Sequence, residues 1–133
     1  MIEMLSFGVR YIVNDIDSAI SFYTKQLGFE IAMHPNNFFA ILARGGLHLM
    51  LNTPTGPGGG AYATPDGRKP EPGGWNRIQI QVSDLTKEVA RLREAGAHFR
   101  TDIITGIGAK QILLDDPSGN LIELHELLPR QEG

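Results

Sequence analysis

An internal repeat constrains this chain more than any other feature of its sequence. The segment Val9–Ile16 reads VRYIVNDI, and the segment Ile78–Leu85 reads IQIQVSDL. In both, apolar residues alternate with variable ones and then reach valine, a polar residue, aspartate and an aliphatic residue. Alternation with period two is typical of a β-strand, and an aspartate at its end favours the start of a helix. The chain is therefore expected to contain two similar halves, each opening with a strand and a helix.

Apolar residues at helical spacing follow each of the repeated strands. They are Ile16, Ile20, Tyr23 and Leu27 in the first half, and Leu85, Val89 and Leu92 in the second. Asp15 and Asp84 stand where a helix N-cap is expected, and Gly28 and Gly96 stand where each helix should end. Each helix is predicted to lay its apolar stripe on a sheet.

Three further strands are predicted after each helix. They span about 29–34, 37–44 and 46–52 in the first half, and about 98–104, 109–115 and 120–127 in the second. Gly45-Gly46 and the segment Asp116–Gly119 have the residues of tight hairpin turns. The element order is then βαβββ, linker, βαβββ, which makes the fold class α+β.

The linker between the halves covers residues 53–74 and is rich in glycine and proline. It holds 7 of the 16 glycines and 5 of the 8 prolines, so neither a helix nor an inner strand is expected there. Its 22 residues exceed most connections, which leaves two interpretations, a functional lid or a mobile tether. The run Gly56–Gly60 is not a phosphate loop, because no lysine and no helix follow it.

Composition excludes several classes of function. The 133-residue chain has no cysteine, which excludes disulfides and thiolate metal sites and suits a reducing cytoplasm. Its net charge of -3, with both signs mixed along the chain, gives no electrostatic footprint for nucleic acid or an anionic membrane. The apolar runs are too short to span a membrane, and Met1–Leu5 does not read as a signal peptide.

Alternation along the strands sorts their side chains onto two faces. The residues expected to pack under the helices are Val9, Tyr11, Val13, Leu47, Leu49, Leu51, Ile78, Ile80, Val82, Ile122 and Leu124. The residues left on the opposite face are Gly8, Arg10, Ile12, His48, Met50, Asn52, Arg77, Gln79, Gln81, Leu121, Glu123 and His125. This mixed face is either a solvated sheet surface or the lining of a small-molecule cleft.

Two motifs add a family resemblance to this pattern. The segment 116–124 reads DPSGNLIEL, and the segment 15–23 reads DIDSAISFY and is followed by Leu27-Gly28-Phe29. Both are similar to the glyoxalase/bleomycin resistance protein/dioxygenase (vicinal oxygen chelate, VOC) superfamily. The resemblance implies one domain over 1–133, with module 1 at about 5–52, the linker 53–74 and module 2 at about 75–128. It further implies a curled eight-stranded mixed sheet, a ligand cleft lined by the mixed face, and a homodimer.

Enzymes of this family bind one divalent metal ion at four strand positions, which the resemblance carries onto Gly8, His48, Arg77 and Glu123. Glycine has no side chain to coordinate, and arginine is a permanent cation that only donates hydrogen bonds. His48 and Glu123 alone are too few for a catalytic metal site. The alternatives for these two residues are a hydrogen-bonded pair, or an ion pair between Arg77 and Glu123.

The favoured function is metal-independent binding of a small organic ligand, with no cofactor. The ligand-binding residues expected from this interpretation are Arg10, Ile12, His48, Met50, Asn52, Trp75, Arg77, Gln79, Gln81 and His125. Trp75 would form a wall of a lid or anchor the linker. The alternative is a metal-dependent glyoxalase-like lyase, isomerase or dioxygenase, with Zn, Ni, Fe or Mn on His48 and Glu123, or with Glu123 as general base. A structural dimer module is the third interpretation.

Overall fold

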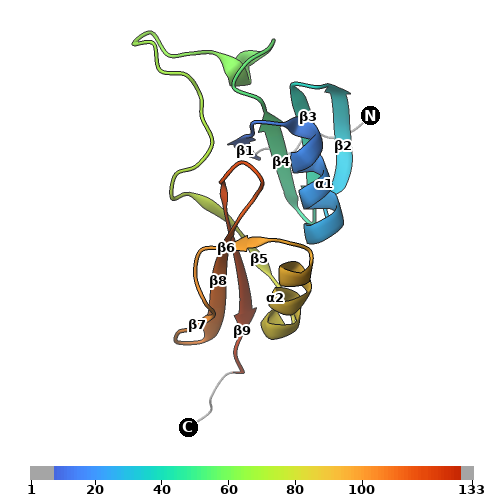
Figure 1. The fold of residues 1–133 in the computed structure, drawn as a ribbon, viewed down its shortest axis with the longest axis vertical. Helices are drawn as coiled ribbons and strands as arrows, with labels where there is room; N and C mark the ends of the chain where they lie inside the picture. Colours follow the sequence, from blue (N-terminus) through green and yellow to red (C-terminus); the bar gives the residue numbers. More distant parts are fainter. Residues whose placement is uncertain (1–7, 130–133) are drawn as a thin grey trace. The chain divides into compact units, whose positions relative to one another are not determined.

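The computed structural model describes residues 8–129, which form two compact units (Figure 1). The boundary lies between Gly73 and Gly74. We call residues 8–73 unit 1 and residues 74–129 unit 2. Each unit contains one sheet and one α-helix, so the α+β class expected from the sequence is confirmed. No helix among these described residues has the length and apolar character needed to cross a membrane.

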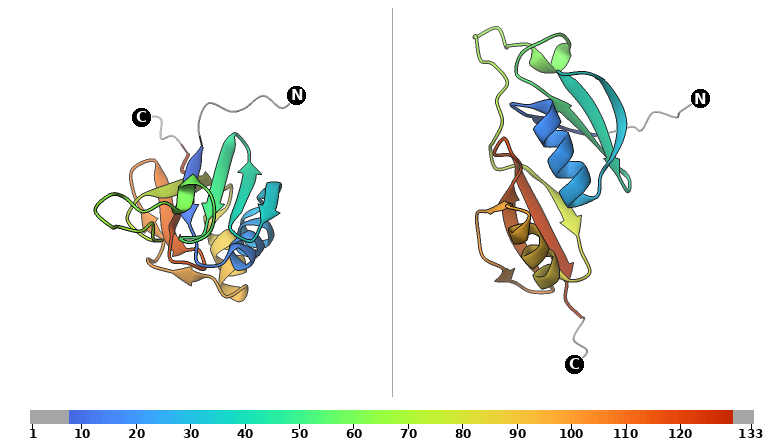
Figure 2. Two further views of the ribbon diagram at one scale, coloured as in Figure 1. Left: turned by 90° about the horizontal axis from the view of Figure 1, so that it is seen from above. Right: turned by 45° about the vertical axis from the view of Figure 1, so that its right-hand side comes forward.

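Unit 1 is built on a four-stranded sheet with the strand order β1-β4-β3-β2. Its elements are β1 (Val9–Ile12), α1 (Ile16–Leu27), β2 (Glu30–Asn36), β3 (Phe39–Arg44) and β4 (Leu47–Asn52). β1 runs parallel to β4, and the other pairs are antiparallel. Helix α1 lies along one face of this sheet (Figure 2). Gly45, at φ +57°, turns β3 into β4 at the predicted Gly45-Gly46 hairpin.

Both predicted helix starts are confirmed, and α1 ends at the predicted Gly28. Helix α2 (Leu85–Glu94) ends at Glu94, with Ala95 as its C-cap, and the predicted Gly96 comes next with φ +86°. The Asp15 carboxylate accepts a hydrogen bond from the backbone N–H of Ser18 at 3.1 Å, and Asp84 accepts one from Lys87 at 3.1 Å. Each bond satisfies one of the amide groups that a helix leaves unpaired at its first turn. Gly28, directly after α1, has the left-handed φ of +73° that glycine adopts without strain.

The core of unit 1 lies between α1 and the sheet. The buried side chains of α1 are Ile16, Ala19, Ile20, Tyr23 and Leu27, and those facing them from the strands include Tyr11, Ala40, Leu42, Leu49 and Leu51. Tyr23 is fully buried and packs edge-on against Phe22 and Phe29, with ring centres 5.2 and 5.4 Å apart. The helix face and the strand alternation were both predicted, so the opposite sheet face is the one free for another role.

Unit 2 repeats this arrangement with the strand order β5-β9-β8-β6, and β7 pairs with β8. Its elements are β5 (Arg77–Gln81), α2 (Leu85–Glu94), β6 (His98–Phe99), β7 (Ile104–Thr105), β8 (Ala109–Asp115) and β9 (Leu121–Leu127). β5 runs parallel to β9, as β1 does to β4. The predicted helix stripe of Leu85, Val89 and Leu92 is buried.

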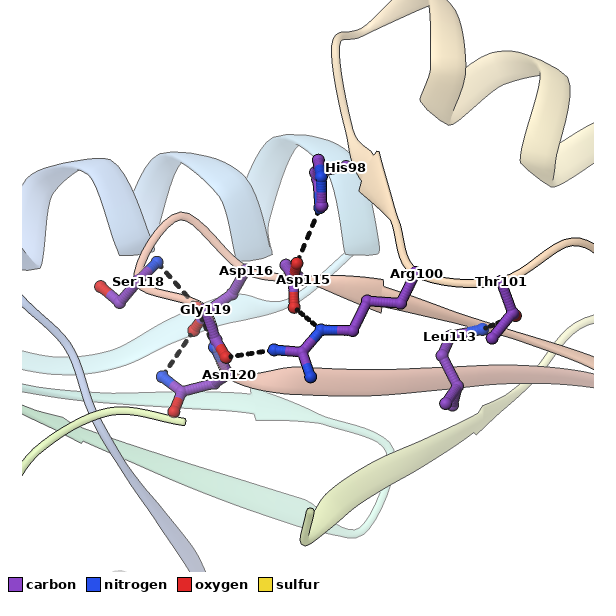
Figure 3. Close-up of polar contacts among 9 residues, drawn as sticks. All are labelled: His98, Arg100, Thr101, Leu113, Asp115, Asp116, Ser118, Gly119 and Asn120. Carbon is purple, nitrogen blue, oxygen red and sulfur yellow. Dashed lines mark hydrogen bonds and ion pairs between the residues drawn. The ribbon is translucent and has the colours of Figure 1, made fainter. Parts of the chain in front are cut away.

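The single strand predicted over 98–104 is wrong, because the chain forms the two short strands β6 and β7 instead. The described residues therefore contain nine strands in place of eight. The ladder with β8 continues as far as Arg100, whose N–H donates to the carbonyl of Leu113 at 2.9 Å. The N–H of the same β8 residue, Leu113, donates to the Thr101 hydroxyl at 3.1 Å (Figure 3). A threonine side chain thus takes the place of a backbone acceptor and interrupts the strand.

The turn between β8 and β9 is held by the side chain of Asp116, which is 3% exposed. One carboxylate oxygen accepts from the backbone N–H groups of Ser118 at 2.8 Å and Asn120 at 2.9 Å. The other accepts from the Asn120 side-chain amide at 3.0 Å (Figure 3). Gly119 closes the turn with φ +87°, as the sequence predicted.

The linker has little regular structure, in agreement with its composition. It contains one 3-10 turn, η1 (Gly59–Ala61), and a local turn at Thr64–Arg68 in which the Thr64 N–H donates to the Arg68 carbonyl at 2.9 Å. The hydroxyl of Thr64 donates to Asp66, and this bond, with one from the Arg68 N–H, lowers the pKa of the Asp66 carboxyl. Part of the linker is therefore folded on itself.

Candidate functional site

Four of the predicted ligand-binding residues lie together on the helix-free face of the unit 1 sheet. Arg10 is paired in register with Met50, and Ile12 with Asn52, on the parallel strands β1 and β4. Paired residues point to the same side, and their neighbours Tyr11, Leu49 and Leu51 are buried on the other. Arg10 Nη2 lies 3.7 Å from Met50 Sδ, a weak acceptor.

A cavity of about 370 Å³ opens at the end of this face, where β1 and β4 end and the linker begins. It is lined by strand residues and by the start of the linker, namely Arg10, Asn36, Phe39, Asn52, Pro57, Gly58, Gly59 and Gly60. Its volume falls in the range of small-molecule sites, about 300–1,000 Å³. Arg10 and Asn52 were predicted, whereas the other six lining residues were not.

Two polar side chains of this cavity, Asn52 and Arg10, keep hydrogen-bonding capacity that the described residues leave largely unused. Asn52 is 4% exposed, and its Oδ1 is buried without a hydrogen-bond donor. A buried acceptor without a donor is unfavourable, so it is a position at which a ligand gains by donating. Among residues 8–129, no carboxylate forms a salt bridge with Arg10. Arg10 and Asn52 therefore offer a ligand one cation and one buried acceptor.

The helix-free face of the unit 2 sheet is organised around Glu123, whose side chain is 7% exposed. Arg77 Nε donates to Glu123 Oε1 at 3.0 Å, and the Gln79 amide donates to Glu123 Oε2. The parallel register of β5 and β9 places Gln79 directly beside Glu123. The ion pair between Arg77 and Glu123 that the sequence left as one alternative is confirmed.

Two predicted histidines carry buried ring nitrogens without partners. His48 Nδ1 in unit 1 and His125 Nδ1 in unit 2 are both buried and unbonded. His125 lies in register with Gln81 on the same face as Glu123. Trp75 is 76% exposed, so it does not anchor the linker by burial.

The residues at the family's metal positions do not fit a metal ion. Gly8 offers no ligand, and a Cβ added there would lie 3.0 Å from the carbonyl oxygen of His48. Both oxygens of Glu123 are already engaged by the cation of Arg77 and the amide of Gln79. Within either unit, the described part of the chain holds no group of three His, Asp or Glu side chains placed to bind a metal.

A second polar cluster in unit 2 joins β6 to β8 and was not predicted (Figure 3). The Asp115 carboxylate lies 2.7 Å from His98 Nδ1 and 2.7 Å from Arg100 Nε, and Arg100 Nη2 donates to the carbonyl of Gly119 at 3.1 Å. His98 is largely exposed, with 77% of its side chain accessible. The cluster therefore links the short strand β6 and the residue Arg100 that follows it to β8 and to the β8–β9 turn.

Comparison with known proteins agrees with the repeat and the two sheets. The family model described as "Glyoxalase/Bleomycin resistance protein/Dioxygenase superfamily" matches residues 7–124. The chain belongs to this superfamily. The glyoxalase/bleomycin resistance family resemblance found in the sequence is thereby confirmed.

Individual relatives support the same assignment. The protein YurT of Bacillus subtilis is 31% identical over 120 residues, which cover 84% of this chain and 91% of YurT. A superfamily member from Sphaerobacter thermophilus is 27% identical with a TM-score of 0.71, over 92% of this chain and 98% of that one. The fosfomycin resistance protein FosX of Listeria monocytogenes is 18% identical with a TM-score of 0.69, over 96% of both chains, which shows the fold alone.

Proposed function

We propose that this protein is a cytoplasmic, metal-independent binder of a small organic molecule, and that the helix-free sheet faces carry its ligand. One observation above all supports the proposal. Both carboxylate oxygens of Glu123, the strongest metal-ligand candidate, already accept hydrogen bonds, one from Arg77 and one from Gln79. Releasing this carboxylate to a metal ion would leave Arg77 beside a second cation, and the two charges would repel.

Unsatisfied polar atoms on the same faces explain how such a ligand would be held. His48, Asn52 and His125 each keep a buried nitrogen or oxygen without a partner. Buried polar groups are normally hydrogen-bonded, so these atoms mark positions that a bound molecule would complete. Within unit 1, the apolar side chains of Ile12 and Met50 supply contact area of the kind that lines ligand sites.

The protein is expected to carry no stoichiometric transition metal, because two ligands and a fixed cation do not make a metal site. Elemental analysis of protein purified without added metal measures this directly. Arg77→His should raise the affinity for Zn²⁺ or Ni²⁺, since it removes the cation and frees Glu123. One equivalent of metal per chain, lost in both His48→Ala and Glu123→Gln, would favour the metal-dependent lyase, isomerase or dioxygenase instead.

A homodimer is part of the same proposal. Strand β2 forms one edge of the unit 1 sheet, all seven of its residues are exposed, and Ile31 and Met33 are each about half exposed. An open edge with apolar side chains is a surface that a second chain can cover. Light scattering at tens of micromolar should give twice the 14.6 kDa mass of the chain. A monomer mass at that concentration would contradict the dimer, and Ile31→Lys should shift a true dimer toward monomer.

A further inference from the structure

We propose that the cavity of unit 1 recognises a small carboxylate with an N–H or O–H donor on the neighbouring carbon, and that Gly60 is the residue that makes this site possible. The inference rests on the proposed function, because it names the ligand class of one of the faces described above. It draws on three features of the cavity, namely its cation, its buried acceptor and the close approach of the linker.

The cation is Arg10, a residue of β1 that lines the cavity. The one hydrogen bond of its side chain to a described residue is the long contact with Met50 Sδ, so most of the guanidinium donors are available. A guanidinium presents its N–H groups in a planar fork that matches the two oxygens of a carboxylate. Among residues 8–129, no second arginine or lysine lines the cavity, which favours a singly charged group over a phosphate ester.

The acceptor is Asn52 Oδ1, which is buried and unbonded. A ligand that reaches it must bring a donor, because an ether, a second carboxylate oxygen or an apolar group would leave the oxygen unsatisfied. Sites built around a buried polar group discriminate strongly against analogues that lack the matching group. The donor requirement therefore gives specificity, and the arginine gives charge attraction.

Gly60 brings these two groups to the same point. A Cβ added at Gly60 would lie 2.5 Å from Arg10 Nη1 and 2.6 Å from Asn52 Oδ1, far inside contact distance. Both atoms thus border one position of the linker and are near neighbours of each other. A ligand that satisfies both must carry its carboxylate and its donor close together, as on adjacent carbons.

Another lining residue indicates the chemical character of the rest of the ligand. Phe39 lies on β3 in register with Asn52 and is one of the residues that line the cavity. An aromatic wall favours an apolar or aromatic body. An N-acyl amino acid of modest size combines a carboxylate, an amide N–H on the neighbouring carbon and an apolar group, and hippurate (N-benzoylglycine) is the simplest probe of this kind.

Titration calorimetry of chelator-treated protein with three matched probes tests the chemistry. Hippurate should bind, N-methylhippurate, which lacks the donor, should bind about tenfold more weakly, and benzoylglycinamide, which lacks the charge, should lose at least as much. Arg10→Gln should remove the preference for hippurate over benzoylglycinamide. Equal affinity for the charged and the neutral probe in the wild-type protein would overturn the proposal.

Two neighbouring glycines provide a matched pair of variants. Gly60→Ala should weaken hippurate binding at least tenfold, because its methyl group collides with Arg10 and the buried Asn52. Gly59→Ala should bind like the wild type, because a Cβ there meets no atom within 4 Å. Neither glycine has a positive φ, so alanine introduces no backbone strain at either position. Equal binding by the two variants would overturn the role of Gly60.

The outcome for hippurate separates this inference from the proposed function. If the metal-free protein does not bind hippurate but binds neutral or cationic fragments at the sheet faces, this inference is wrong and the proposed function stands. If no fragment binds until a divalent metal is added, both are wrong. Chemical shift changes at the amides of β1, β4 and the linker distinguish these cases.

Discussion

Replacing Asp116 with alanine is expected to lower the free energy of unfolding by about 3 kcal/mol. The buried carboxylate accepts three hydrogen bonds, two from the backbone of the β8–β9 turn and one from the Asn120 side chain. Alanine would leave donors of Ser118 and Asn120 without their acceptor in a site where Asn120 is 3% exposed. Thermal and urea unfolding of the full chain measure the change.

Two further variants test whether the loss of stability comes from the hydrogen bonds of Asp116. One removes only its charge, and the other changes the neighbouring residue instead. Asp116→Asn keeps an oxygen for the backbone donors, so it should recover much of the loss. Asp115→Ala changes the neighbouring residue. Its ion-pair partners His98 and Arg100 have side chains that are 77% and 35% exposed, so water replaces part of the lost interactions and the cost should be about 1 kcal/mol. Equal effects of the two alanine substitutions would contradict the structural role given to Asp116 (Figure 3).

The elements that were predicted correctly from the sequence are those with local causes. Asp15 and Asp84 cap helices through their own next turn, and Gly28 ends one because its backbone is left-handed. Strand alternation likewise assigned the two faces of each sheet, because side chains in a strand point to opposite sides in turn. Alternation also assigned Arg77 and Glu123 to the same mixed face, and the ion pair between them, left as one of two alternatives, is present in the structure.

The elements that were not predicted depend on contacts between distant segments. The break between β6 and β7 arises because Thr101 bonds to Leu113 on another strand, and no pattern within 98–104 signals that contact. The cavity likewise needs Gly60 to approach Arg10 and Asn52. Glycine-rich composition predicted an irregular linker, but it does not specify where such a segment packs.

Arg77→Met is expected to lower the free energy of unfolding by about 2 kcal/mol, the second-largest effect on stability. The substitution keeps a long side chain but removes the positive charge from beside Glu123, whose side chain is 7% exposed. Gln79 would then be the remaining donor to a nearly buried carboxylate. Arg77 itself is 31% exposed, so water replaces part of the lost interaction and the cost stays below that of a fully buried pair.

The double variant Arg77→Met/Glu123→Gln identifies the source of that cost. A neutral glutamine no longer needs the cation and still bonds to Gln79, so the double variant should be more stable than Arg77→Met alone. Non-additivity of this sign is the signature of a charge pair in a double-mutant cycle. If Glu123→Gln instead lowers the free energy of unfolding of the Arg77→Met variant further, Arg77 is not the group that stabilises the carboxylate. The argument against a metal at Glu123 then fails as well.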